Sequence, residues 1–256
     1  MPARDGRIAG RITGRIAGRI SGGSAVMEAR MIPLFSQKTM DFLTENRMRD
    51  DKEWFNAHRA IYEEHVVAPL VYLAKTLAPV LSEIDGQLIC SPKAGGSVSR
   101  VWRDARYSKD KSLFRDVMWC MFVRRKYMGL PEYFFVISPE YYLYGCGYYS
   151  AGAASMESIR RLIISGDEGF DAACSAYENQ DVFLMEGDFY KKSRYPDHPE
   201  RARNWLERKT ICFTRTSSDF DPLYSDKLAG TVAEGYMALA PIYRFLIKAE
   251  EKLAET

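Results

Sequence analysis

The sequence predicts an α+β fold: a single domain whose central antiparallel sheet of about five to six strands is flanked by helices from both chain ends. Apolar residues recur at helical spacing before residue 85 and after residue 225, while most of the strand-like runs lie between. Helices on either side of a block of strands favour α+β over a doubly wound parallel sheet. Hydrophobic residues make up 46% of the chain and charged residues 27%, an ordinary composition for a domain with a packed core.

The first 30 residues differ from the rest of the chain. Residues 6–22 read GRIAGRITGRIAGRISG, four copies of a four-residue unit. A helix there would carry a glycine in every turn, each costing about 1 kcal/mol relative to alanine, with no broad apolar face to offset it. We therefore expect a disordered tail over residues 1–30 and one domain over residues 31–256. Three origins stay open: a translated DNA repeat ahead of a start at Met27 or Met31, a basic arm for nucleic acid or anionic lipid, and an organelle presequence.

Helices are expected first. Apolar spacing predicts a short helix over residues 39–46, followed by a polar break. Asp50 or Asp51 in that break can cap the next helix, which continues as far as an Asp-Gly turn. Pro69 and Pro79 lie within this second helical region. Because proline lacks an N–H group, we expect a kink or a restart at each.

Strands are expected next. Six segments have strand character: residues 98–103, 117–123, 133–138, 141–149, 182–185 and 210–214. The apolar run VMWCMFV over residues 117–123 suits a strand that is covered on both faces. A tight turn at Pro139-Glu140 joins the third segment to the fourth, so these central strands should form an antiparallel meander.

Helical spacing returns in the second half of the chain. It predicts helices over residues 155–163, 170–177 and 200–208. A long C-terminal helix is expected from about Ser225 to Leu253, with Ala233, Tyr236 and Phe245 among its inward-facing residues.

Composition excludes several classes of function. The five cysteines form no C-x-x-C pair, which argues against a disulfide framework or a zinc site and indicates a reducing cytoplasm. We expect no metal and no cofactor. Apolar runs fall short of the roughly 20 residues that a membrane helix needs. The net charge of +2 includes +4 from residues 1–30, so the rest sums to −2. A nucleic-acid partner is therefore not expected.

The strongest chemical signal lies between Arg100 and Arg115, where six cationic residues accompany two acidic ones. Its candidate ligand-binding residues are Arg103, Asp104, Arg106, Ser108, Lys109 and Lys111. Ser108 can cap a turn with outward-facing N–H groups, and guanidinium groups beside such a turn would suit a phosphate or carboxylate. The alternative is a salt-bridged strand and turn in which Asp104 and Asp110 each hold a neighbouring cation. In an extended chain Asp104 and Arg106 would share one side.

A second candidate is the tyrosine-rich segment over residues 141–149. Gly145 and Gly147 fall on the same face of the expected strand, where two absent side chains would open a shallow floor. Such a floor admits a ligand ring, walled by Tyr141 or Tyr149, or a closely packed helix. The sequence leaves both interpretations open.

Several motifs resemble a known family. The series Phe42-Leu43, Asn46, Glu53-Trp54-Phe55, Tyr62 and Pro69-Leu70 looks like the start of the domain-of-unknown-function 2461 family, and Arg103-Asp104-Ala105-Arg106-Tyr107-Ser108-Lys109-Asp110-Lys111-Ser112 resembles its most distinctive motif. Gly145-Cys146-Gly147, Ile159-Arg160, Asp197-His198-Pro199 and Lys209 match later landmarks. The resemblance implies an α+β domain and transfers no catalytic residue. An enzyme or binding module for an anionic ligand and a non-catalytic interaction domain both remain possible.

Overall fold

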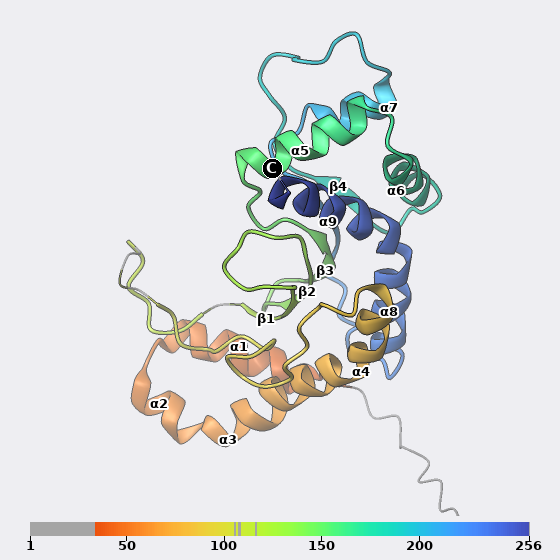
Figure 1. The fold of residues 1–256 in the computed structure, drawn as a ribbon. Helices are drawn as coiled ribbons and strands as arrows, with labels where there is room; N and C mark the ends of the chain where they lie inside the picture. The colour runs from red at the N-terminus through yellow and green to blue at the C-terminus, as the bar shows by residue number, and fades with distance from the viewer. Residues whose placement is uncertain (1–33, 105, 107–108, 116, 256) are drawn as a thin grey trace, which may run out of the picture. The chain divides into compact units, whose positions relative to one another are not determined.

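Helices at both ends of the chain enclose one antiparallel sheet in the computed structural model, which describes residues 34–104, 106, 109–115 and 117–255 (Figure 1). The helices in this part of the chain are α1 (Gln37–Arg49), α2 (Lys52–Ala57), α3 (Arg59–Tyr62), the π-helical turn η1 (Glu63–Val67), α4 (Ala68–Ile84), α5 (Ala153–Ile164), α6 (Glu168–Glu178), α7 (Glu200–Leu206), α8 (Leu228–Ala238) and α9 (Ala240–Ala254). The strands are β1 (Met118–Phe122), β2 (Glu132–Ile137), β3 (Tyr142–Gly147), β4 (Leu184–Glu186) and β5 (Cys212–Ser217). The α+β prediction is confirmed. The expectations for residues 1–30 lie outside the described residues.

The sheet has the strand order β1-β2-β3-β5-β4, and every neighbouring pair is antiparallel. The predicted meander is β1-β2-β3. The Ser138 hydroxyl stabilises its second turn, because it accepts hydrogen bonds from the N–H groups of Glu140 (3.2 Å) and Tyr141 (3.1 Å). The expectation that β1 would be covered on both faces is wrong. β1 lies at the sheet edge, and Trp119 and Met121 on one of its faces are only half-buried.

The expected strand over residues 98–103 does not form a continuous ladder. It makes isolated bridges instead, from Val98 to Cys120 and from Trp102 to Phe114. Its first residues pair with β1 and its last residues pair with residues 113–115, so the hydrogen-bonding partner changes midway. Residues on both sides of this change are extended and hydrogen-bonded, but neither partner pairs with enough of them to add a sixth strand to the sheet.

One face of the sheet carries the tyrosine-rich part of the core. Tyr133 on β2 lies against Tyr236 of α8 and Tyr243 of α9, with ring centroids 4.7 and 5.1 Å apart. The Tyr133 hydroxyl donates to the Tyr236 carbonyl oxygen over 3.2 Å. A buried tyrosine requires such a partner for its hydroxyl, and helices from the C-terminal end of the chain supply it here.

The two internal prolines behave differently from each other. Pro69 stands at the start of α4, directly after the π-helical turn, which agrees with the predicted restart. Pro79 lies inside an uninterrupted α4, so the helix does not restart there. Both Pro79 and Lys75, whose carbonyl loses its N–H partner, are exposed, and water can hydrate that carbonyl.

The helical stretch Arg59–Ile84 is long and apolar enough to cross a membrane by length and composition alone, unlike the shorter runs expected from the sequence. In the structure its apolar face is part of the core: Leu70, Leu73 and Leu77 are fully buried. This burial is typical of the core helix of a globular domain.

The expected single C-terminal helix is two helices. The break falls at Leu239, just before Pro241 in the first turn of α9. Proline at this position has no N–H to continue the α8 hydrogen-bond ladder. The chain turns between the helices (Figure 1), so that α8 contacts α4 whereas α9 contacts α5 and α6.

Candidate functional site

The charged segment forms the end of a short excursion from the sheet edge. Its two arms, residues 101–103 and 113–115, run antiparallel: the Arg103 N–H donates to the Leu113 carbonyl (3.0 Å) and the Arg115 N–H to the Val101 carbonyl (2.8 Å). We call the described residues 103, 104, 106 and 109–112 the charged loop. Aromatic residues close its base: the Phe114 ring packs on Trp102 at 4.7 Å and on Phe55 at 4.9 Å.

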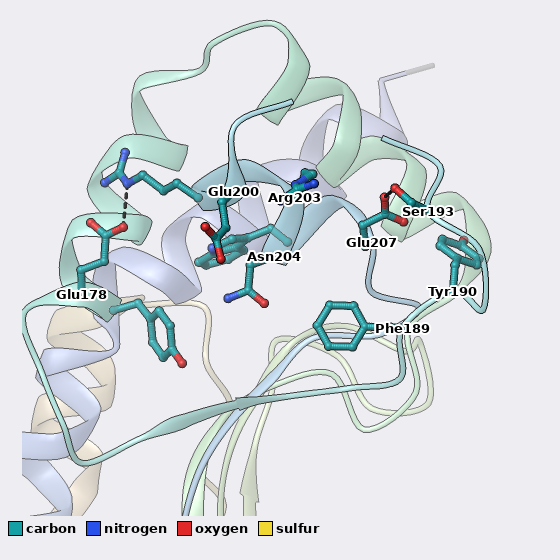
Figure 2. A pocket seen from close by; sticks show the side chains of 11 residues that line it. Glu178, Phe189, Tyr190, Ser193, Glu200, Arg203, Asn204 and Glu207 are labelled. Atoms are coloured by element: carbon teal, nitrogen blue, oxygen red, sulfur yellow. Dashed lines mark hydrogen bonds and ion pairs between the residues drawn. The ribbon is translucent and has the colours of Figure 1, made fainter. Parts of the chain in front are cut away.

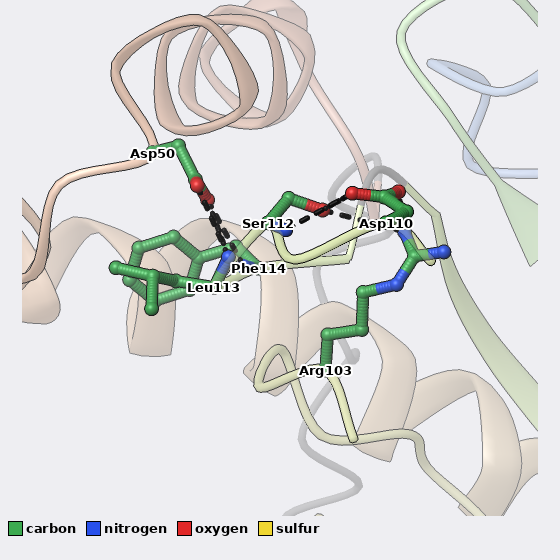
Figure 3. A network of polar contacts seen from close by, with 6 residues as sticks. All are labelled: Asp50, Arg103, Asp110, Ser112, Leu113 and Phe114. Carbon is green, nitrogen blue, oxygen red and sulfur yellow. Dashed lines mark hydrogen bonds and ion pairs between the residues drawn. The ribbon is translucent and has the colours of Figure 1, made fainter. Parts of the chain in front are cut away.

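Asp50 fixes one arm of this excursion to the N-terminal helices. It is the C-terminal cap of α1 in the left-handed conformation (φ 45°). Its carboxylate accepts hydrogen bonds from the N–H groups of Leu113 (2.8 Å) and Phe114 (3.2 Å) (Figure 3). Of the two aspartates expected as helix caps, Asp51 caps α2 by accepting from the Trp54 N–H. Asp50 has the separate task of holding the loop.

Ion pairs link the acids of the charged loop to its arginines. Arg103 Nη1 lies 2.7 Å from Asp110 Oδ2 (Figure 3). Arg106 binds Asp104 with two groups, Nε at 2.9 Å and Nη2 at 2.7 Å. Hydrogen bonds from Arg106 lower the pKa of Asp104 to about 2. The backbone N–H and hydroxyl of Ser112, and then the Arg103 charge, lower the pKa of Asp110. Both acids are therefore ionised at neutral pH.

These pairs are on the surface. The Arg106 side chain is 77% exposed and that of Asp104 is 54% exposed. Lys109 and Lys111 are exposed as well, whereas the side chain of Arg103 is 29% exposed. Ser108 lies outside the described residues. Exposed ion pairs are screened by water and contribute little to stability, so these pairs chiefly orient the arginines.

Gly145 and Gly147 do not form an open floor. A Cβ atom at Gly145 would lie 1.9 Å from the Phe213 carbonyl oxygen, and one at Gly147 would lie 2.5 Å from the Cys212 Cα. Gly147 also has a φ of +145°, which side-chain-bearing residues rarely adopt. The neighbouring strand β5 fills the space that the sequence suggested for a ring or a helix. Among the described residues, no hydrogen bond joins these glycines to the charged loop.

The model of a family of conserved hypothetical proteins, DUF2461, matches residues 38–245, which include the charged loop and all five strands. The chain belongs to the DUF2461 family. The resemblance seen in the sequence is thereby confirmed. A comparison with curated proteins finds no match. Across the described part of this DUF2461 chain, no three His, Cys, Asp or Glu side chains are grouped to hold a metal ion.

The DUF2461 domain also contains an open cavity of about 650 Å³ that the sequence did not indicate (Figure 2). It lies between the end of α6, helix α7 and residues 189–193. Its lining residues are Tyr177, Glu178, Phe189, Tyr190, Ser193, Glu200, Arg201, Arg203, Asn204, Trp205 and Glu207. A second hollow of about 500 Å³ is lined by α1 residues only. The first has opposing walls and falls within the volume range of roughly 300–1,000 Å³ that is usual for ligand pockets.

Glu207 fastens one wall of this cavity. Its carboxylate accepts hydrogen bonds from the Ser193 hydroxyl (2.6 Å) and from the backbone N–H groups of Arg194 and Tyr195 (both 2.9 Å). Burial raises the pKa of Glu207, but these hydrogen bonds outweigh it and the net pKa is lowered. The Glu207 carbonyl also accepts from the Tyr190 N–H (2.9 Å). The loop opposite α7 is thus held in place before any ligand arrives.

Two arginines support the same wall from behind. Arg160, 4% exposed, donates to the carbonyls of Leu206 (3.0 Å) and Arg208 (2.7 Å) and to the Tyr190 hydroxyl (3.1 Å). Arg208 donates to the Gly187 carbonyl (2.8 Å). Arginine cannot lose its proton in a protein, so each needs several acceptors when buried. The sequence predicted the helix over residues 200–208, but nothing in it joined that helix to α6 and residues 189–193.

Proposed function

We propose that this DUF2461 domain binds a small ligand bearing a phosphate or carboxylate group at the charged loop. The observation that carries the proposal is the placement of Arg106, Lys109 and Lys111 at the surface of a loop whose base is clamped. The segment from Arg100 to Arg115 carries six cations and two acids, and the nearby Asp50 carboxylate binds backbone N–H groups, so the segment has a local positive excess. Such an excess attracts an anion and is costly without one.

The ion pairs support binding by exchange. A guanidinium group that already makes a bidentate contact with a carboxylate, as Arg106 does with Asp104, is oriented to bind a phosphate in the same way. Because the pair is exposed, a ligand can replace Asp104 without leaving a buried charge. Asp110 is held by Ser112 as well as by Arg103, so that end of the loop keeps its shape during the exchange.

A second function, a non-catalytic interaction domain, is favoured by the same ion pairs. If Asp104 and Asp110 are the permanent partners of the arginines, the loop is a rigid surface feature that needs no ligand. The two functions predict different responses to anions.

The proposal also covers the partners and the location of the protein. We propose a cytoplasmic location, because all five cysteines are free and three of them are buried thiols. The proposed partner is a small-molecule ligand. Neither a nucleic acid nor a membrane is part of the proposal, since residues 31–256 together carry a net charge of −2.

Thermal melts with inorganic phosphate or sulfate, at an ionic strength held constant with sodium chloride, test the proposal. A ligand at about 100 times its Kd stabilises by roughly 2.7 kcal/mol, which is about 5–11 °C for a domain of this size. The double variant Arg106→Gln/Lys109→Gln removes two exposed cations of the loop, so it should lose this shift while melting near the wild-type temperature without anion.

The control variant is Lys38→Gln/Lys75→Gln, which removes one exposed cation from α1 and one from α4. It should respond to phosphate as the wild type does. If no anion raises the melting temperature of the wild type beyond the effect of chloride, the loop is an interaction surface and the binding proposal is wrong.

A further inference from the structure

The cavity between α6, α7 and residues 189–193 is separate from the charged loop, and most of its polar groups are already engaged. Glu178 pairs with Arg201 at 2.8 Å. Glu207 is bound by Ser193 and two backbone N–H groups. The exposed Glu200 side chain makes no hydrogen bond or ion pair in the described part of the chain. Its carboxylate is therefore available to accept from a ligand.

Asn204 supplies the complementary donor. Its Oδ1 accepts from Arg208 Nη2 over 3.2 Å, and a guanidinium group can only donate. The orientation of the amide is thereby fixed, with its Nδ2 group left to donate elsewhere. Glu200 and Asn204 are four residues apart on α7, so they share one face of the helix. Figure 2 shows both among the residues around the cavity.

Phe189 adds a flat apolar wall opposite α7 (Figure 2). Its side chain is 49% exposed, although the residue is anchored by a backbone bridge to Arg208. The Arg208 guanidinium lies 4.3 Å from the ring centroid on one face. A cation behind the ring disfavours a second cation in front of it and favours a neutral, electron-rich ring. Stacking of this kind is how aromatic side chains hold nucleobases.

We propose that this cavity binds a purine base, with guanine as its best match. The guanine O6 accepts from Asn204 Nδ2, its N1–H and exocyclic amino group donate to the Glu200 carboxylate, and the ring stacks on Phe189. Adenine offers one donor and one acceptor to the same two residues, so it forms fewer hydrogen bonds. The cavity is large enough for a nucleoside.

Guanosine is the probe, because it carries no phosphate and does not compete for the charged loop. Titration calorimetry and saturation-transfer NMR should detect binding to the full chain. Inosine, which lacks the exocyclic amino group, should bind less tightly than guanosine. Adenosine and 1-methylguanosine, which lacks the N1–H donor, should bind at least about 10-fold less tightly, since a hydrogen bond to a charged group is lost.

Three variants test the assigned contacts. Glu200→Gln should weaken guanosine binding about 10-fold. Asn204→Asp should weaken it at least as much, because both α7 groups then accept, while the new carboxylate still binds Arg208 and keeps the fold. Phe189→Leu should weaken it by about 5-fold or more through lost stacking. Melting temperatures of all three should stay near that of the wild type.

The matched controls are Glu83→Gln on α4 and Asn56→Asp on α2, both exposed and far from the cavity lining. They should bind guanosine as the wild type does. Three results would each overturn the proposal: no guanosine binding at millimolar concentration, unchanged affinity in Glu200→Gln and Asn204→Asp, or equal affinity for 1-methylguanosine. Binding of phosphate without guanosine would leave the charged loop as the ligand site and reject the cavity.

Discussion

Glu132 has an unusual environment for a carboxyl group. It lies opposite Gly147 in β3, and Gly147 in turn lies opposite Cys212 in β5. Gly147 contributes no side chain that could contact the Glu132 carboxyl group. Glu132 is half-buried, and its carboxyl group has no hydrogen-bond partner among the described residues. Burial raises the pKa of Glu132 to about 7.

This raised pKa predicts a pH-dependent stability. The folded state disfavours ionisation, so the free energy of unfolding should fall as pH rises from about 4.5 to about 7 and stay constant above it. The full effect is about 3 kcal/mol. Glu132→Gln should therefore be more stable than the wild type at pH 8 and equal to it near pH 4. Urea unfolding of both proteins across this range measures the difference. A difference that does not vary with pH would contradict the assignment, and Glu186→Gln on the exposed edge strand is the control.

Arg160 and Arg161 are adjacent on α5 but differ in burial. The Arg160 side chain is 5% exposed and donates to two carbonyls and a hydroxyl, whereas that of Arg161 is 69% exposed. Arg160→Met would leave these acceptors buried without a donor and should lower the free energy of unfolding by about 3 kcal/mol. Arg161→Met should change it by less than about 1 kcal/mol. Chemical denaturation compares the two, and equal losses would show that the Arg160 contacts contribute nothing.

At the scale of elements, one aspartate joins the helical N-terminal part to the charged loop. Asp50→Ala removes the acceptor for the Leu113 and Phe114 N–H groups and places alanine in a left-handed conformation. We expect a loss of about 2 kcal/mol and faster hydrogen exchange at the Leu113 and Phe114 amides.

Asp50→Asn is the matched control, because asparagine tolerates the left-handed region and keeps a carbonyl acceptor. Its amides at 113 and 114 should exchange nearly as slowly as those of the wild type. Equal exchange in the alanine and wild-type proteins would show that the aromatic base of the loop holds the arm without Asp50.

At the scale of the whole molecule, the stability of the domain should not depend on residues 1–30, which carry the repeat. Residues 1–30 have no packable apolar face, so we expect their deletion to leave the fold unaffected. Each kcal/mol of lost stability would lower the melting temperature of a domain this size by about 2–4 °C. Melting of the full chain and of a chain starting at Met31 should therefore coincide. A decrease of more than a few degrees would show that the tail contacts the domain.

Local sequence patterns predicted where helices and strands lie better than they predicted which elements pair or pack together. Residues close in sequence predict the β1-β2-β3 meander, the cap at Asp51 and helix α7. The break before Pro241 was missed, because proline is compatible with the helix interior, as at Pro79, as well as with the first turn of a new helix, and the tertiary structure decides between them. The interruption of the expected strand over residues 98–103 was missed too, because its pairing depends on how far β1 and residues 113–115 extend.

The sequence by itself determined the α+β class, the family and the concentration of charge between Arg100 and Arg115, since these depend on residue type and spacing. Tertiary structure alone decided that β5 fills the space beside Gly145, that Asp50 clamps the charged loop, and that Glu200 and Asn204 face Phe189 across a cavity. The first two contacts join residues more than 60 positions apart, and Glu200 and Asn204 lie 11 and 15 positions from Phe189. Such contacts arise from burial of the whole core, and no local pattern encodes them.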